Sequence, residues 1–391
     1  LMKYADRVDR LAGEAADAWG LYVIAAQRKS EGQDIIMLSI GDTDFESPDV
    51  VIEEAYAALK RGRTNYANIT GIQPLREAIA KRQARKSGVE ITPDQVVVTQ
   101  GAQNALYNVA QCLLDPGCEV IVPEPMYVTY PATIEGTGAN LISVESRAEN
   151  NFHPTIEDIA GAITDKTQAI FLATPNNPTG AVYTRTELEA IAELCKKHDL
   201  WLVSDEVYGD LTYENEHFSA ISLPGMRERT IAISSLSKSH AMAGWRLGWA
   251  IVPEELAEHM DRLGLCSTYG TSTFIQDAAI VAIEEIPEGI AEMKVAYTNR
   301  RERFCNFLNN LPGLACRMPE GGMFAMLDVR ATGLSAYDYA HKLLDDQGIS
   351  TLPADAFGPS AKGFLRINMG ASDDLLDEAA RRIEAFEKTL V

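Results

Sequence analysis

The fold of this chain is decided by residues 168–205, which read QAIFLATPNNPTGAVYTRTELEAIAELCKKHDLWLVSD. An apolar run of strand length opens the stretch, a loop rich in proline and asparagine follows, and Thr184-x-x-Glu187 has the pattern of a capping box that starts a helix. A second apolar run, 200–203, completes a strand–helix–strand unit. Such alternation predicts a largely parallel sheet that is covered by helices on both faces.

The same alternation continues on either side of this stretch. Upstream, a proline and a glycine bracket each of two amphipathic segments, and we expect helices there. These two helices span 48–62 and 74–88, and a third helix spans 102–114. Further strands are predicted at 96–99, 119–122, 141–144 and 230–234. After about residue 253 the pattern turns helical, and short strands at 323–328 and 364–368 indicate a smaller α+β unit.

Composition narrows the class of protein. The 391 residues are 46% hydrophobic and carry 35 basic and 56 acidic side chains, a formal net charge of -21. No basic stripe interrupts this acidity, so we expect no nucleic-acid partner. The longest apolar runs have the length of strands, which argues against a membrane span. The six cysteines are scattered without a CxxC pair or a His/Cys cluster, so we expect no metal site, reduced thiols and a cytoplasmic location.

Polar side chains follow several of the predicted strands, at the edge of the sheet where open parallel sheets bind ligands. Gly101 follows the first strand and opens directly into a helix, whose N-terminus suits a phosphate, although a tight turn alone also explains it. Asp205 ends another buried strand and needs a cation or strong donors there, unless it caps a helix. Neither a P-loop nor a complete GxGxxG occurs, which argues against nucleoside triphosphates and NAD.

The last strand of the alternating region, 230–234, leads into Ser235, Lys238 and Arg246. These side chains and those at the other strand ends match one ligand, because pyridoxal 5'-phosphate has a phosphate, a cationic ring nitrogen and an electrophilic carbonyl. The Gly101 turn, Ser235 and Arg246 suit the phosphate, Asp205 the ring nitrogen, and the Lys238 amine the carbonyl.

With these motifs in place, the chain resembles the class I/II aminotransferases of fold type I, which depend on pyridoxal phosphate, along essentially its whole length. The segments that carry the resemblance are 41–48, 65–66, 101–103, 175–180, 204–208, 235–246, 319–324 and 365–367. The resemblance implies an α/β fold with a mainly parallel sheet in a large cofactor-binding domain, 48–290. It also implies a smaller α+β domain made of 1–47 plus 291–391.

The resemblance assigns roles to several residues around the cofactor. Lys238 is the lysine that binds the cofactor covalently and later moves the substrate's proton. Asp205 keeps the ring nitrogen protonated, and Tyr208 and Asn177 hydrogen-bond the ring oxygen. Tyr127 stacks on the ring. Ala102 and Gln103 belong to the phosphate-binding turn with Gly101.

For the substrate, the resemblance implies that Arg366 grips the α-carboxylate, with Gly41 and Asn177 beside it. Tyr66 matches a residue that reaches the cofactor phosphate of the neighbouring subunit, which implies a homodimer with shared sites. The expected activity is the transfer of an α-amino group from an L-amino acid to a 2-oxo acid by a ping-pong mechanism.

The amino donor is expected to be non-acidic. In one close branch that favours aspartate, a lysine stands where this chain has Gln103. The segments 124–130, 235–242 and 275–279 instead point to the arginine–pyruvate transaminase branch, and Asp42, Asp44 or Glu135 offers a carboxylate for a basic substrate.

Two alternatives accompany this interpretation. The same scaffold serves C–S lyases, which expel a leaving group from the β-carbon of the substrate. Aminotransferase-like domains also bind effectors in transcription regulators, but those regulators carry an added basic DNA-binding segment, and no such segment precedes Gly41 in this sequence.

Overall fold

The computed structural model describes residues 2–12 and 15–390. Its centre is a seven-stranded sheet with the strand order β2-β8-β7-β6-β5-β3-β4. The strands are β2 (Val96–Thr99), β3 (Glu119–Glu124), β4 (Asn140–Glu145), β5 (Thr167–Ala173), β6 (Trp201–Asp205), β7 (Thr230–Ser235) and β8 (Gly248–Ile251). Strand β8 runs antiparallel to both neighbours, and the remaining pairs are parallel. The mainly parallel sheet predicted from the sequence is therefore confirmed.

Helices cover both faces of this sheet because the side chains of each strand point alternately to opposite sides. On one face, apolar residues of α5 (Ala102–Leu113), α6 (Tyr130–Glu135) and α9 (Glu254–Cys266) pack on alternate strand residues such as Val122, Phe171 and Ile233. On the other face lie α3 (Asp49–Lys60), α4 (Gln73–Ser87), α7 (Ile156–Gly161), α8 (Arg185–His198) and α10 (Thr273–Glu285).

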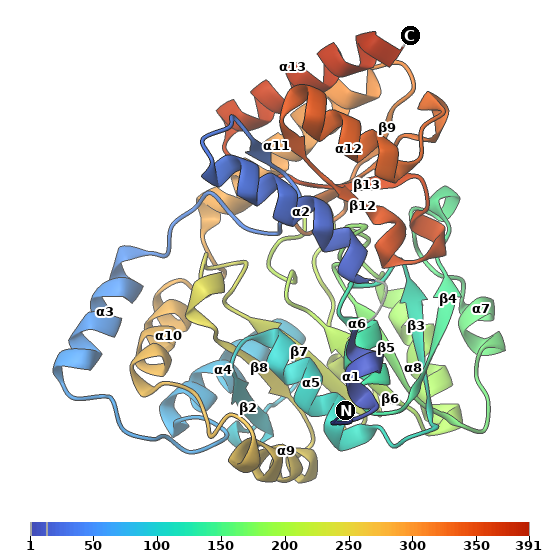
Figure 1. Cartoon of the computed structure of the whole chain (residues 1–391). Helices are drawn as coiled ribbons and strands as arrows, with labels where there is room; N and C mark the ends of the chain where they lie inside the picture. Colours follow the sequence, from blue (N-terminus) through green and yellow to red (C-terminus); the bar gives the residue numbers. More distant parts are fainter. Residues whose placement is uncertain (1, 13–14, 391) are drawn as a thin grey trace.

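A second core lies above the large sheet in Figure 1. It contains the antiparallel sheet β12-β13-β10-β9 and the parallel pair β1–β11. Its strands are β1 (Ile36–Met37), β9 (Ala315–Arg317), β10 (Phe324–Asp328), β11 (Ile349–Ser350), β12 (Leu352–Pro353) and β13 (Phe364–Asn368). Its C-terminal helices are α11 (Ala291–Asn309), α12 (Ala336–Gln347) and α13 (Asp373–Leu390).

The two N-terminal helices lie against different parts of the molecule. Helix α2 (Ala15–Ser30), blue in Figure 1, places Leu21 and Ala25 in the second core beside the orange and red C-terminal elements. Helix α1 (Arg7–Ala12) lies on α6 instead, where Arg10 Nε donates to the Glu135 carbonyl oxygen over 2.8 Å. The domain boundaries 47/48 and 290/291 stay a prediction.

Local sequence signals locate most elements within a residue or two. The predicted capping box is present, with Thr184 accepting from the Glu187 N–H and the Glu187 side chain accepting from the Thr184 N–H. Strand β8 was not expected, because four residues beginning with glycine show no alternation and follow a loop instead of a helix. Within residues 2–12 and 15–390, no helix has both the length and the apolar character needed to cross a bilayer.

Candidate active site

A cavity of about 230 Å³ opens at the carboxyl ends of the parallel strands. It brings together every site residue expected from the sequence except Gly101, which adjoins it, and Tyr66. The predicted residues that line the cavity are Gly41, Ala102, Gln103, Tyr127, Asn177, Asp205, Tyr208, Ser235, Lys238, Arg246 and Arg366. Segments more than 300 residues apart in the chain thus share one site.

Lys238 follows β7 and projects its amine into this cavity. The amine donates to the Gly41 carbonyl oxygen over 2.5 Å. Burial lowers the pKa of Lys238 to about 8; Asp42 opposes this shift, whereas Arg366 and Arg246 add to it. A substantial fraction of the amine is therefore neutral near pH 8, as a nucleophile or a proton acceptor requires.

Asp205 is the last residue of β6 and is buried. Its carboxylate accepts from the Tyr130 hydroxyl over 3.1 Å and from the Val207 N–H over 3.2 Å. Burial raises the pKa of Asp205 to about 6, and these two hydrogen bonds oppose the rise. No helix follows β6 directly, so Asp205 caps none, and its charge calls for a cation on the cavity side.

The N-terminus of α5 forms one end of the cavity. Gly101 precedes this helix with φ +84°, and a Cβ there would lie 2.5 Å from Arg246 Nη2. Arg246 is held over the turn because it donates to the Ala243 and Gln100 carbonyl oxygens over 2.8 and 3.3 Å. The guanidinium, the free N–H groups of the helix and the Ser235 hydroxyl together make a positive, hydrogen-bonding end suited to a phosphate.

Arg366, on β13, lines the cavity from the second core. Nη1 donates to Asn177 Oδ1 over 3.0 Å and Nη2 to the Ser39 carbonyl oxygen over 2.6 Å. The guanidinium carbon lies 4.1 Å from the ring centroid of Phe324 and 5.1 Å from that of Phe357. Among the described residues, nothing accepts a hydrogen bond from its buried Nε. Arg366 is thus a cation whose orientation is fixed and whose Nε–H is still free to donate a hydrogen bond.

Gly41 approaches Phe324 so closely that a Cβ there would lie 2.6 Å from Cζ of its ring, and the ring would have to move to admit one. The bare backbone can therefore approach both the Phe324 ring and the Lys238 amine. This close approach explains the glycine at the start of the 41–48 segment.

The aromatic and amide side chains of the site are uncharged. Burial raises the pKa of the phenols of Tyr127 and Tyr208, so both keep their hydroxyl proton. The Gln103 amide accepts from the Thr129 hydroxyl over 2.8 Å and donates to the Thr133 hydroxyl over 3.2 Å. Gln103 thus ties the start of α5 to α6 and brings no charge into the cavity.

Tyr66 lies outside the cavity. Its side chain is 85% exposed, and its ring centroid is 4.9 Å from that of Tyr269. Its role toward a partner subunit stays a prediction.

Sequence reasoning assigned no role to three contributors to the site. Tyr130 belongs to the quoted 124–130 segment and Phe324 to 319–324, so both lay within recognised motifs. Ser39 contributes a backbone carbonyl oxygen, for which a sequence carries no signal.

The donor set of this cavity fits pyridoxal 5'-phosphate. Asp205 is the most specific part of the fit, because its carboxylate is buried in the cavity wall, no cation of the described residues shifts its pKa, and a protonated ring nitrogen would supply the missing charge. Arg246, Gly101 and Ser235 would hold the phosphate, and Lys238 lies in the same cavity to bind the carbonyl.

Comparisons with known proteins agree with this fit. The chain matches the model of the family Aminotransferase class I and II over residues 33–383. It is 48% identical to arginine–pyruvate transaminase AruH of Pseudomonas aeruginosa, over 98% of this chain and 97% of that protein. The structure of Thermus thermophilus aspartate aminotransferase with maleate superposes with a TM-score of 0.93 at 35% identity, covering 98% and 100% of the two chains. Alanine aminotransferase from Pyrococcus furiosus gives a TM-score of 0.92 at 32% identity, covering 99% and 100%.

Proposed function

This chain belongs to the aminotransferase class I and II family and is an aminotransferase, and we propose that its amino donor is arginine or another non-acidic L-amino acid and its acceptor pyruvate. The observation that carries the substrate assignment is the 48% identity, over nearly the whole chain, to a protein named arginine–pyruvate transaminase.

The charges of the cavity support a non-acidic donor. Lys238, Arg246 and Arg366 are the cations among the described lining residues, and the proposed cofactor and the α-carboxylate account for all three. A donor with a second carboxylate would need a further cation. At the position in α5 where a lysine stands in one aspartate-preferring branch, this chain has the uncharged Gln103.

We assign the following roles to the residues of this chain. When bound, pyridoxal 5'-phosphate supplies an electron sink for the negative charge that develops at the substrate's α-carbon. Arg366 holds the α-carboxylate through a planar fork of donors, which fixes the orientation of the substrate. Lys238 accepts the α-proton as a neutral amine and returns it later. Asp205 stabilises positive charge on the ring nitrogen, and Arg246 anchors the phosphate.

For a basic donor, the carboxylate best placed to receive the side-chain cation is that of Asp42. It is exposed, accepts from the Thr43 N–H over 3.0 Å and lies near enough to Lys238 to oppose the fall of its pKa. Asp44 does not serve, because both of its oxygens accept from Arg300, over 2.8 and 2.7 Å. None of the three carboxylates is among the residues that line the cavity, and Asp42 is the one whose charge acts on the Lys238 amine.

The proposal also includes a homodimer in the cytoplasm. The exposed Tyr66 borders a surface hollow with Asn68, Leu265 and Tyr269, and an exposed aromatic pair of this kind suits a subunit interface. All six cysteines are free thiols, which suits a reducing compartment.

A single-turnover experiment tests the donor. The cofactor-saturated protein is mixed with arginine, alanine, aspartate or phenylalanine in the absence of any 2-oxo acid. We expect one equivalent of the corresponding 2-oxo acid per site, released fastest from arginine. Faster release of the 2-oxo acid from aspartate would rule out the proposed donor class. In a separate reaction with a cysteine conjugate, release of ammonia and pyruvate would favour the C–S lyase alternative.

Paired variants test the recognition of the donor's side chain. Asp42→Asn should raise KM for arginine about tenfold, because it removes a charge partner of the guanidinium, and should leave KM for alanine unchanged. Asp44→Asn is the matched control and should lower stability without changing the preference between the two donors. Equal changes in both KM values for Asp42→Asn would contradict the assignment.

A further inference from the structure

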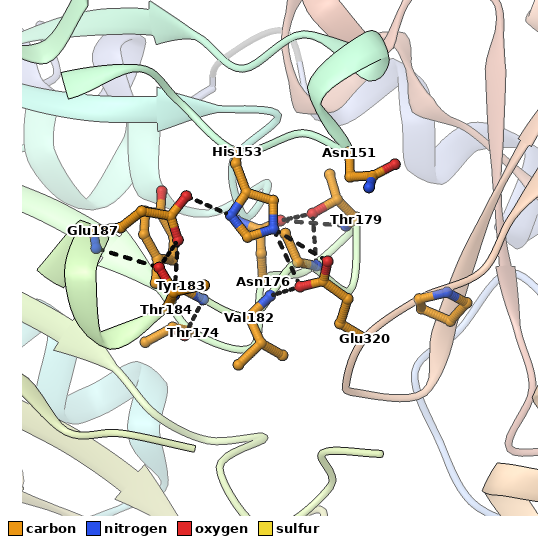
Figure 2. Close-up of polar contacts among 12 residues, drawn as sticks. Asn151, His153, Thr174, Asn176, Thr179, Val182, Tyr183, Thr184, Glu187 and Glu320 are labelled. Atoms are coloured by element: carbon orange, nitrogen blue, oxygen red, sulfur yellow. Dashed lines mark hydrogen bonds and ion pairs between the residues drawn. The ribbon is translucent and has the colours of Figure 1, made fainter. Parts of the chain in front are cut away.

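His153 lies between two carboxylates outside the cavity (Figure 2). It comes from the segment between β4 and α7, whereas Glu187 belongs to the first turn of α8 and Glu320 precedes β10. Nδ1 is 2.8 Å from Glu187 Oε1, and Nε2 is 3.1 Å from Glu320 Oε2. Each ring nitrogen faces an acceptor, so both must carry a proton for both hydrogen bonds to form, and the imidazole is then a cation.

The charges around His153 favour that cation. Burial lowers the pKa of His153, but the hydrogen bonds and charges of Glu187 and Glu320 outweigh this and raise it to about 9. The other titratable group facing the ring is Tyr183, 6.0 Å between ring centroids, and burial keeps its phenol neutral. Arg317, on β9, lies over the neighbouring Phe152 ring. His153 is therefore charged at neutral pH.

Glu320 ties the segment that precedes β10 to the large sheet's loops. Besides His153, its Oε2 accepts from the Val182 N–H over 2.9 Å, and its own N–H donates to the Gly180 carbonyl oxygen over 3.0 Å. The Tyr213 N–H donates to the Glu320 carbonyl oxygen over 3.1 Å. The same short segment is thus joined both to the loop that follows Asn177 and to the turn that follows Tyr208.

Four residues after Glu320, Phe324 reaches the site. Its ring stacks on the Arg366 guanidinium at 4.1 Å and lies 6.1 Å from the Tyr208 ring, between centroids. Arg366 also donates to Asn177, whose loop Glu320 contacts at Gly180 and Val182. Two of the four contacts of the guanidinium, those with Phe324 and Asn177, therefore come from segments that Glu320 joins, whereas the Ser39 carbonyl oxygen and the Phe357 ring contact it independently.

We propose that His153 is a positioning residue for the substrate's α-carboxylate: by clamping Glu320 against the Gly180–Val182 loop, it holds Phe324 and Asn177 in the arrangement that orients Arg366. The inference rests on the proposed role of Arg366.

Four single variants, the double variant of His153→Gln with Glu320→Gln, and Arg366→Lys test the clamp in the cofactor-loaded enzyme. KM and kcat are measured for the fastest donor of the four-amino-acid panel and for pyruvate. His153→Gln removes the cation, His153→Arg retains one, and Glu320→Gln removes one acceptor. His198→Gln, on the exposed end of α8, is the matched control. The dissociation constant of 2-methylalanine, which has an α-carboxylate but no α-proton, is measured by calorimetry.

We expect His153→Gln to raise both KM values and the dissociation constant about tenfold, with kcat and cofactor content nearly unchanged, because binding geometry and not the reacting groups is disturbed. His153→Arg should recover most of the loss. The double variant of His153→Gln with Glu320→Gln should raise KM little more than either single variant, because both substitutions break the same His153–Glu320 contact. Above about pH 9, KM should rise more steeply in the wild-type enzyme than in His153→Arg, because Lys238 and the amino group of the substrate titrate in both proteins whereas His153 titrates only in the wild type.

Other outcomes overturn the inference in distinguishable ways. If His153→Gln lowers the melting temperature but leaves KM and the dissociation constant at the values of His198→Gln, the clamp is only structural. If Arg366→Lys also leaves KM unchanged, the proposed role of Arg366 fails together with the inference. If Arg366→Lys raises KM and His153→Gln does not, only the positioning role fails.

Discussion

At the scale of a single residue, Asp205 shows how a site is built at the expense of the protein's own stability. A buried carboxylate without a cation is costly, and its hydrogen bonds from Tyr130 and Val207 offset only part of that cost. The position is favourable only when a cation occupies the cavity. In the proposed function that cation is the ring nitrogen of the cofactor, so the cofactor would offset the cost of burying Asp205.

Asp205→Asn should stabilise the cofactor-free protein at pH 7.5 while abolishing transamination. The folded-state pKa of Asp205, about 6, lies above the ordinary 3.8, so the folded protein binds more protons between these values and loses stability as pH rises through 6. The variant escapes this loss, which the two pKa values put at about 3 kcal/mol. Urea unfolding at pH 7.5 and pH 5 measures the free energy of unfolding of both proteins. The extra stability of Asp205→Asn over the wild type should be smaller at pH 5.

Asp165→Asn is the control for this prediction, because Asp165 is exposed in a turn and its substitution should change stability little at either pH. A cofactor-free Asp205→Asn protein that is less stable than the wild type at pH 7.5 would contradict the prediction.

At the scale of an element, the N-terminus of α5 has the geometry of an anion site. The helix follows β2 after only Gln100 and Gly101, the glycine having a positive φ, so its free N–H groups emerge at the sheet edge. The antiparallel strand β8 passes beneath this turn, where a Cβ on Gly248 would lie 2.6 Å from the Ala102 nitrogen. Arg246, just before β8, is thereby brought over Gly101.

Gly101→Ala should raise the dissociation constant of pyridoxal 5'-phosphate about tenfold, because the new methyl group displaces Arg246 Nη2 from the anion site. Titration of the cofactor-free protein measures the constant. Gly117→Ala is a matched control, since Gly117 has φ +89° with no atom within 4 Å of an added Cβ.

Both glycines have positive φ, so an alanine is strained at either position, by about 1–3 kcal/mol. Only Gly101→Ala should weaken cofactor binding. An equal loss of affinity in Gly117→Ala would attribute the effect to general destabilisation.

At the scale of the whole molecule, the site joins both cores of the chain. Gly41 and Arg366 come from segments near the two ends of the sequence and close the cavity over Asp205 and Lys238 of the large sheet. Tyr66 does not line this cavity, and its exposed side chain is available to another subunit. A monomer would leave that predicted contact unused.

Mixing two inactive variants tests the shared site. If Tyr66 serves the partner's cofactor, Tyr66→Ala and Lys238→Ala subunits should complement each other, because one site of each mixed dimer receives both intact residues. Random assembly from equal amounts should restore about a quarter of the wild-type activity. No recovery after co-expression would place Tyr66 in its own chain's site or outside any site.

The sequence by itself determined the parallel sheet and much of the site within it. Strand and helix periodicity located the strand ends, and a ligand in a parallel sheet binds at those ends, so Gly101, Asp205, Ser235 and Lys238 were predictable together. Family motifs added Arg366 and Gly41.

Only the tertiary structure decided how the distant segments meet. The antiparallel return of β8, the Ser39 carbonyl oxygen on Arg366 and the stacking of Phe324 depend on packing between elements far apart in the chain. The same holds for the choice of Asp42 over Asp44 and for the His153 clamp. Local periodicity reports which face of an element is apolar, whereas these contacts are fixed when the two cores pack, so no local pattern encodes them.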